Sequence, residues 1–123
     1  KIRLSNKILH YGFADSFKEY AQWLWRAHIL PVTSLHEFFG ASVVEAVYCG
    51  CVPLLPDRLS YPDLFPPEKF AAYFYSDFEE LLNKLALLLK VSNRDSLAEA
   101  VSGFKWEVMA PHYDRFLEQL ATR

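Results

Sequence analysis

Two short apolar runs on either side of a helical segment constrain the fold most. The runs HILPVTS (28–34) and CVPLLP (51–56) have the length and composition of buried strands. GASVVEAVYCG (40–50), which lies between them, has the pattern of a helix that Gly50 ends. Strands that alternate with helices favour βαβ units. The sequence therefore predicts an α/β protein with a Rossmann-like parallel sheet and flanking helices.

The remaining segments extend the same alternation. Residues 57–70 carry Pro62, Pro66 and Pro67 and are predicted as a loop. The other predicted elements are a strand at 7–14 that ends near Gly12, a helix at 15–27 capped by Asp15 or Ser16, a strand at 71–76, a helix at 76–90 capped by Ser76 or Asp77, and helices at 94–104 and 105–123, the second interrupted at Pro111.

Composition and charge exclude several classes. The 123 residues are 52% hydrophobic, which is enough for one folded domain. A net charge of −2 provides no broad basic surface of the kind that dominates nucleic-acid binding. No apolar run reaches the roughly 18 residues of a membrane span, and no secretory signal begins the chain. We therefore expect a cytoplasmic protein without a membrane segment. Because Met109 is the single methionine, we expect a piece of a longer protein.

The cysteines and histidines do not predict a metal site. Cys49 and Cys51 are spaced as Cys-x-Cys, unlike redox or zinc motifs, and are expected to be reduced and apolar in their packing. The four histidines include no pair at the spacing of metal ligands. We expect no metal and no bound cofactor.

The segment SLHEFFGASVVEA (34–46) lies where an α/β sheet binds its ligands. Loops 34–40 and 56–67 follow predicted strands, and ligands bind beyond the carboxyl ends of such strands. The amides at the start of the helix that begins near Gly40 favour phosphate. Glu45 stands among apolar residues, and a ribose diol would suit its carboxylate. This pattern predicts a nucleotide sugar with its pyrophosphate at the helix N-terminus, its ribose on Glu45 and its sugar near Glu37.

Simpler interpretations exist for both carboxylates. Glu45 could be a solvated residue on an ordinary helix, and Glu37 could merely complement the helix dipole. The surrounding pattern favours the ligand site instead, because a strand precedes Glu37, a helix runs through Glu45, and GCVPLLPD follows.

This pattern resembles a family signature. Retaining glycosyltransferases of the GT-B fold, in family 4, carry Glu, seven residues and a second Glu. This second Glu begins the sequence Glu-Ala-x-x-x-Gly-x-Pro. The resemblance covers residues 8–65 well. A longer segment (36–66) is similar to the subfamily that transfers mannose to queuosine in tRNA, although Asp63 stands where that subfamily has Glu. The residues in register with the signature are Glu37, Phe39, Gly40, Glu45, Ala46, Gly50 and Pro53.

The resemblance implies roles for individual residues. It implies a retaining hexosyltransferase that uses GDP-mannose, with UDP-sugars as the next candidates, and that has queuosine in tRNA as the acceptor. The chain contains no Asp-x-Asp, so a metal-bridged donor is not indicated. Arg58 could aid a phosphate, although a surface arginine is the simpler interpretation. Tyr61 is equally well explained as a packed aromatic. The implied site residues are Glu37 as the catalytic carboxylate beside the donor sugar, Phe38, Phe39, Gly40 and Ala41 at the turn that faces sugar and phosphate, Glu45 on the ribose, and Ser60 and Tyr61 beside the nucleotide.

The resemblance also implies a domain organisation. Residues 1–123 would be part of the C-terminal, donor-nucleotide-binding domain. The N-terminal acceptor domain and the phosphate-binding Arg and Lys would lie outside it, so we expect the piece to be inactive alone. Trp23 and Trp25 lie about 200° apart on a helix. One of them is expected to face outward, which could support a homodimer.

Two other classes of protein fit parts of the pattern. One is a nucleotide-binding α/β module without transfer activity, such as half of an isomerase, for which His36 is the one residue placed as an acid or base. The other is an interaction domain without a ligand. That class predicts that Glu37→Ala and Glu45→Ala change only stability.

Overall fold

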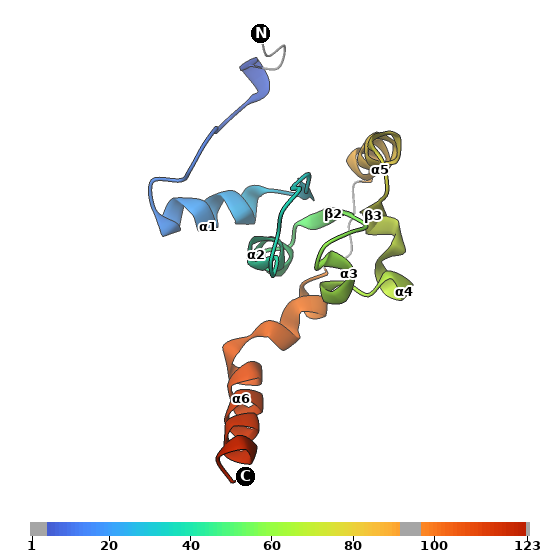
Figure 1. Cartoon of the computed structure of the whole chain (residues 1–123). Coiled ribbons are helices and arrows are strands. Elements are labelled where there is room, and N and C mark those ends of the chain that lie inside the picture. Colours follow the sequence, from blue (N-terminus) through green and yellow to red (C-terminus); the bar gives the residue numbers. More distant parts are fainter. Residues whose placement is uncertain (1–4, 92–96, 123) are drawn as a thin grey trace.

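A three-stranded parallel sheet forms the centre of the molecule. The computed structural model describes residues 5–91 and 97–122. The strands β1 (Ile29–Pro31), β2 (Val52–Pro56) and β3 (Phe74–Tyr75) lie in the order β1-β2-β3, and both neighbouring pairs are parallel (Figure 1). The predicted α/β class with a Rossmann-like parallel sheet is confirmed.

Strand β2 is central although it contains two prolines. Val52 N–H donates to His28 O of the β1 side, and alternate residues of a parallel strand donate to the same neighbour. Pro56 therefore stands where an N–H would reach the carbonyl of Val32. The hydroxyl of Tyr75 donates to that carbonyl instead, at 2.6 Å. This side-chain bond satisfies a buried acceptor that the strand itself leaves without a donor.

Helices cover both faces of the sheet. Leu54 and Leu55 are adjacent on β2, so their side chains point to opposite faces. Leu55 packs in the cluster that holds α2 (Ala41–Tyr48), and Leu54 packs with Leu81 of α5 (Phe78–Lys90). All three leucines are buried, and each such side chain stabilises the fold by about 1.5–3 kcal/mol. This packing holds α2 firmly on the sheet.

The helix caps match the predicted alternatives. Helix α1 (Phe17–Arg26) is capped by Ser16, whose side chain accepts from Glu19 N–H at 3.2 Å. Helix α5 is capped by Asp77, which accepts from Glu80 N–H at 2.8 Å. In both helices the third-position glutamate also accepts the amide of the residue before the cap.

The predicted strand at 7–14 is wrong. Ser5–Lys7 form a short 3-10 helix (η1), and the residues that follow are irregular. Leu9 is 78% exposed and Phe13 is 99% exposed, and the segment runs away from the sheet (Figure 1). No strand among residues 5–91 and 97–122 pairs with it. Without a neighbour, the backbone groups of an extended segment have no ladder to form.

The prediction of a loop at 57–70 is incomplete, because the segment also contains helices. It contains the short helices α3 (Tyr61–Leu64) and α4 (Pro67–Phe70), and the 3-10 helix η2 (Ala71–Tyr73) then shortens the strand predicted at 71–76. Pro62 and Pro67 each lie in the first turn, where a missing N–H costs nothing. The prolines therefore begin helices here instead of preventing them.

The C-terminal part also differs from the prediction. Ala98–Phe104 form a 3-10 helix (η3), whereas the predicted residues 94–96 lie outside the described ranges. Helix α6 (Trp106–Ala121) runs through Pro111 without the predicted interruption, although a proline inside a helix removes one intrahelical hydrogen bond. It projects from the body of the molecule (Figure 1). Within the described part of the chain, no helix is long and apolar enough to cross a membrane.

Candidate functional site

The loops after β1 and β2 meet at one edge of the sheet, as the sequence predicts. A guanidinium nitrogen of Arg58, two residues beyond β2, donates to the carbonyl oxygen of Ser34 at 3.1 Å. Leu59 beside it has φ +60°, in the left-handed region, so the chain turns sharply after Arg58. This carboxyl edge is where parallel sheets bind ligands.

Glu37 holds the turn that precedes α2. One of its carboxylate oxygens accepts the backbone N–H groups of both Phe38 and Gly40, each at 3.0 Å. Gly40 is the N-cap of α2 and makes no side-chain cap hydrogen bond, so Glu37 holds the turn before the helix and leaves the first amides of the helix uncapped. The expectation that the Gly40 amide is free for phosphate is therefore wrong. Within the described residues, no acceptor meets the amides of Ala41 and Ser42.

Position 40 requires a glycine for two reasons, its backbone conformation and the close packing around it. Its φ of +84° lies in the left-handed region, and a Cβ atom there would be 2.8 Å from a side-chain methyl of Leu64. The same Cβ would be 3.5 Å from the ring of Tyr61. Helix α3 thus packs directly against the N-terminus of α2.

The two phenylalanines of the turn point to different surroundings. Phe38 is 98% exposed at the carboxyl edge. Phe39 packs edge-on against Phe104 of η3, with ring centroids 5.7 Å apart. Phe39 therefore helps to hold η3 on α2, and Phe38 is the one available to a ligand.

Glu45 lies on the second turn of α2 and is exposed. Its Oε2 accepts a hydrogen bond from the hydroxyl of Tyr20 on α1 at 2.7 Å. Burial, and then this bond to the carboxylate, raise the pKa of Tyr20 to about 12. The carboxylate is thus neither buried nor without a partner, although the sequence shows it between apolar residues. Its Oε1 has no hydrogen-bond partner among the described residues.

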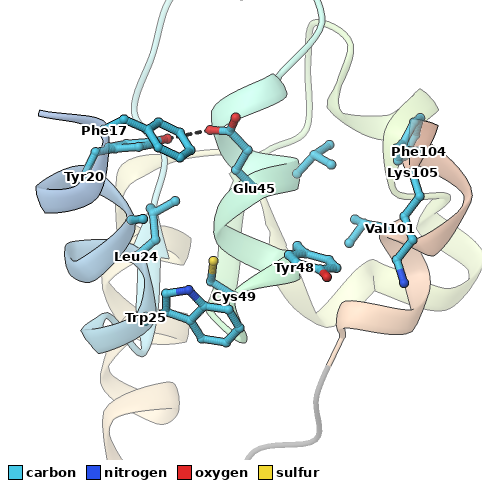
Figure 2. Close-up of a pocket in the computed structure, with 12 residues that line it drawn as sticks. Phe17, Tyr20, Leu24, Trp25, Glu45, Tyr48, Cys49, Val101, Phe104 and Lys105 are labelled. Carbon is cyan, nitrogen blue, oxygen red and sulfur yellow. Dashed lines mark hydrogen bonds between the residues drawn. The ribbon is translucent and has the colours of Figure 1, made fainter. Parts of the chain in front are cut away.

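Glu45 and Tyr20 stand at one end of a groove between α1, α2 and η3 that the sequence did not reveal. We call it the interhelical groove; its volume is about 430 Å³. Figure 2 shows α2 in the middle, with side chains of α1 on one side of it and those of η3 on the other. Lys105 lies at that side, with its ammonium 5.6 Å from the ring centroid of Tyr48. The groove is lined by Phe17, Tyr20, Ala21, Leu24, Trp25, Val44, Glu45, Tyr48, Cys49, Val101, Phe104 and Lys105.

One signal for this groove was present in the sequence. Tyr20 and Leu24 are four residues apart, and so lie on one face of α1. Which helix they face is a tertiary fact that spacing alone does not supply.

Ser60 and Tyr61 begin α3 beside the turn. The Tyr61 side chain is completely buried, and neither its hydroxyl nor that of Ser60 has a hydrogen-bond partner among the described residues. Burial, and then the Glu37 carboxylate, raise the pKa of Tyr61, whereas the Ser34 hydroxyl and the Arg58 guanidinium act in the opposite direction. Ser34 is thus close to the Tyr61 hydroxyl without the geometry of a hydrogen bond.

The remaining candidates do not form a reactive centre. His36 is exposed on the loop. Cys49 and Cys51 are both free thiols, and burial raises the pKa of each. Cys51 contacts the carbonyl of Ala27 at 3.2 Å, as a packed thiol does. No group of three or more His, Cys, Asp or Glu side chains in 5–91 and 97–122 could hold a metal ion.

Comparison with known proteins finds a similar protein. The chain is 35% identical over 83 residues to the tRNA-queuosine alpha-mannosyltransferase of Drosophila melanogaster. The chain is related to a glycosyltransferase. The similar stretch is 68% of this chain and 21% of the relative, so the chain spans about a fifth of that protein's length. No family model and no solved structure matches the chain.

Proposed function

We propose that the chain is the donor-binding part of a retaining glycosyltransferase. It would bind a nucleotide sugar, GDP-mannose, whose hexose is transferred to queuosine in tRNA. One observation carries the proposal: Glu37 lies on the turn before α2 and Glu45 on the second turn of α2, the helix that begins at the carboxyl edge of a parallel sheet. The similarity to a tRNA-queuosine alpha-mannosyltransferase supports it.

The geometry suits the parts of a nucleotide sugar in order. The amides of Ala41 and Ser42 at the N-terminus of α2 would take the diphosphate. From Gly40 to Glu45 the helix rises by roughly 7.5 Å, which is comparable to the span from a diphosphate to the ribose hydroxyls. Because Tyr20 occupies one oxygen of Glu45, the other is available to the ribose. The base would then enter the interhelical groove beside Glu45.

The proposed chemistry is substitution with retention at the anomeric carbon. One oxygen of Glu37 holds the turn, and the other would contact the sugar hydroxyls as the glycosidic bond loosens. The N-terminus of α2 would stabilise the departing diphosphate, which is the larger contribution. A covalent intermediate on a carboxylate, as in many glycoside hydrolases, is not required.

The remaining machinery would lie elsewhere in the protein. We propose that an N-terminal acceptor domain binds the tRNA, that further phosphate-binding Arg and Lys precede this segment, and that the protein is cytoplasmic. The isolated chain is then expected to be inactive and to bind donor weakly. Trp25 is 64% exposed, whereas Trp23 packs beneath Arg26, so self-association through Trp25 is part of the proposal.

Calorimetry on the full-length protein tests the donor site. GDP-mannose, UDP-glucose and UDP-N-acetylglucosamine would be titrated into the wild type, Glu45→Ala and Glu45→Gln. We expect saturable binding of GDP-mannose that Glu45→Ala weakens by about 10-fold or more, as for loss of a charged hydrogen bond. Failure of every nucleotide sugar to bind the wild type would contradict the proposal.

An interaction domain is the second candidate. Helix α6 exposes several large apolar side chains, and exposed apolar surface often binds partners. In that case Glu37→Ala and Glu45→Ala would alter stability alone. The exposed residues are Trp106, Val108, Tyr113, Phe116, Leu117 and Leu120.

A further inference from the structure

Arg58 occupies the junction of the two loops that bound the candidate site. It is exposed, and its one described side-chain contact is the hydrogen bond to the Ser34 carbonyl at 3.1 Å. A guanidinium has five N–H donors, so most of its donors are unused within residues 5–91 and 97–122. A backbone carbonyl is a weak partner for it, and a phosphate oxygen would be a stronger, charge-assisted one.

Tyr61 provides a second, independent sign of a ligand. Its ring lies against Gly40, and its side chain is completely buried. Its hydroxyl nevertheless has no hydrogen-bond partner among the described residues. A buried hydroxyl without a partner destabilises the fold, and a phenylalanine would fill the same space without that cost. The hydroxyl lies close enough to Glu37 and Arg58 for both charges to alter its pKa.

A diphosphate bound at this edge of the sheet would be stabilised by a cation. A donor diphosphate brings negative charge to a place where Glu37 and Glu45 already carry two carboxylates. Lys84 is bound to Glu80 and to backbone carbonyls, and Lys105 lies over Tyr48. Among the lysines and arginines of the described residues, Arg58 is the one whose side chain hydrogen-bonds to the loop before α2.

We propose that Arg58 binds the diphosphate of the donor and that the Tyr61 hydroxyl donates a second hydrogen bond to it. The anion would then be held between the loop after β2 and the N-terminus of α2. The inference rests on the proposed nucleotide-sugar site and deepens it by assigning the cation. Because the hydroxyl is buried in the ligand-free chain, this bond requires a small movement of the groups around it on binding.

A series of ligands isolates the phosphate contribution. Guanosine, GDP and GDP-mannose would be titrated into full-length wild type, Arg58→Gln and Arg58→Lys, with a parallel uridine series. Arg58→Gln is expected to weaken the diphosphate and the nucleotide sugar by about 10- to 100-fold. It should leave nucleoside affinity unchanged, and Arg58→Lys should restore part of the loss because it keeps the charge. Arg115→Gln, which changes an exposed arginine on α6, is the matched control and should have no effect.

The outcomes separate this inference from the proposed function. If the wild type binds GDP-mannose and Arg58→Gln binds it equally well, the inference is overturned and the donor site stands. Equal loss of guanosine affinity would also overturn it, since a nucleoside has no phosphate. If the wild type binds no nucleotide and no nucleotide sugar, both ideas fail together.

A second variant tests the hydroxyl. Tyr61→Phe removes one oxygen from a buried side chain, so it should not lower the melting temperature of the ligand-free protein. GDP affinity should fall by about 3- to 10-fold, as for a lost neutral donor. A lowered melting temperature with unchanged GDP affinity would assign the hydroxyl a structural role and overturn this part.

Discussion

The hydroxyl of Tyr20 donates a 2.7 Å hydrogen bond to Oε2 of Glu45, and this bond joins α1 to α2 at the end of the interhelical groove. It fixes the carboxylate beside the groove and leaves one oxygen for a ligand. Side-chain hydrogen bonds to carboxylates also hold the tyrosine proton more firmly. The pair therefore links stability, pH response and the proposed ribose contact.

Replacing Tyr20 with phenylalanine should flatten the stability profile at alkaline pH. The pKa of Tyr20 is raised from 10.0 to about 12 in the folded chain. Its contribution is therefore fully present below about pH 10 and is lost as the pH rises through about 12. Urea unfolding at about pH 9 and about pH 11.5 should show a smaller loss of stability in Tyr20→Phe than in the wild type. Equal losses in the two proteins would contradict the raised pKa.

Two variants of Glu37 should separate its structural role from its chemical role. Glu37→Ala removes the acceptor for two amides of the turn and should lower the free energy of unfolding by about 1 kcal/mol. Glu37→Gln keeps a side-chain oxygen, so its stability should stay within about 0.5 kcal/mol of the wild type. Both should reduce hexose transfer by the full-length protein by about 100-fold. A Glu37→Gln protein with normal transfer would limit Glu37 to holding the turn before α2.

Alanine at Gly40 should cost more than alanine at Gly50. Both glycines have positive φ, at +84° and +92°, which costs an L residue about 1–2 kcal/mol. A Cβ at Gly40 would also meet Leu64 at 2.8 Å, whereas nothing lies within 4 Å at Gly50. Thermal unfolding should therefore show Gly40→Ala to be less stable than Gly50→Ala by about a further 1 kcal/mol. The reverse order would contradict the packing of α3 on α2.

Removing the Tyr75 hydroxyl should destabilise the sheet. Tyr75→Phe would leave the buried Val32 carbonyl without the donor that stands in for the missing N–H of Pro56. The expected loss is about 1–3 kcal/mol in urea unfolding. Tyr113→Phe, on the exposed face of α6, is a control that should change little. No loss in Tyr75→Phe would mean that another group satisfies that carbonyl.

Local patterns predicted the elements that carry the candidate site. The apolar run of β2, the glycine after α2 and the caps of α1 and α5 each depend on a few neighbouring residues, and the structure confirms them. The strand predicted at 7–14 failed because an apolar run becomes a strand only when another strand pairs with it. The prolines at 62 and 67 led to the prediction of a loop, but a proline that ends one element can also begin a helix.

The contacts within the site were less predictable than its elements. The seven residues between Glu37 and Glu45 place both carboxylates on one helix and its turn, which spacing indicated. Spacing did not indicate that Glu37 would occupy the Gly40 amide, or that Tyr20, 25 residues from Glu45, would share its carboxylate. Such contacts depend on how helices pack, which no single segment determines.

A transfer assay tests the central claim most directly. Full-length wild type and Glu37→Gln would be incubated with GDP-mannose and queuosine-containing tRNA. The tRNA would then be digested, and the masses of its nucleosides would be measured by mass spectrometry. The account predicts that wild type adds one hexose to queuosine and that Glu37→Gln adds little. Absence of the hexose with GDP-mannose and with UDP-sugars, in a wild-type protein that is folded, would contradict it.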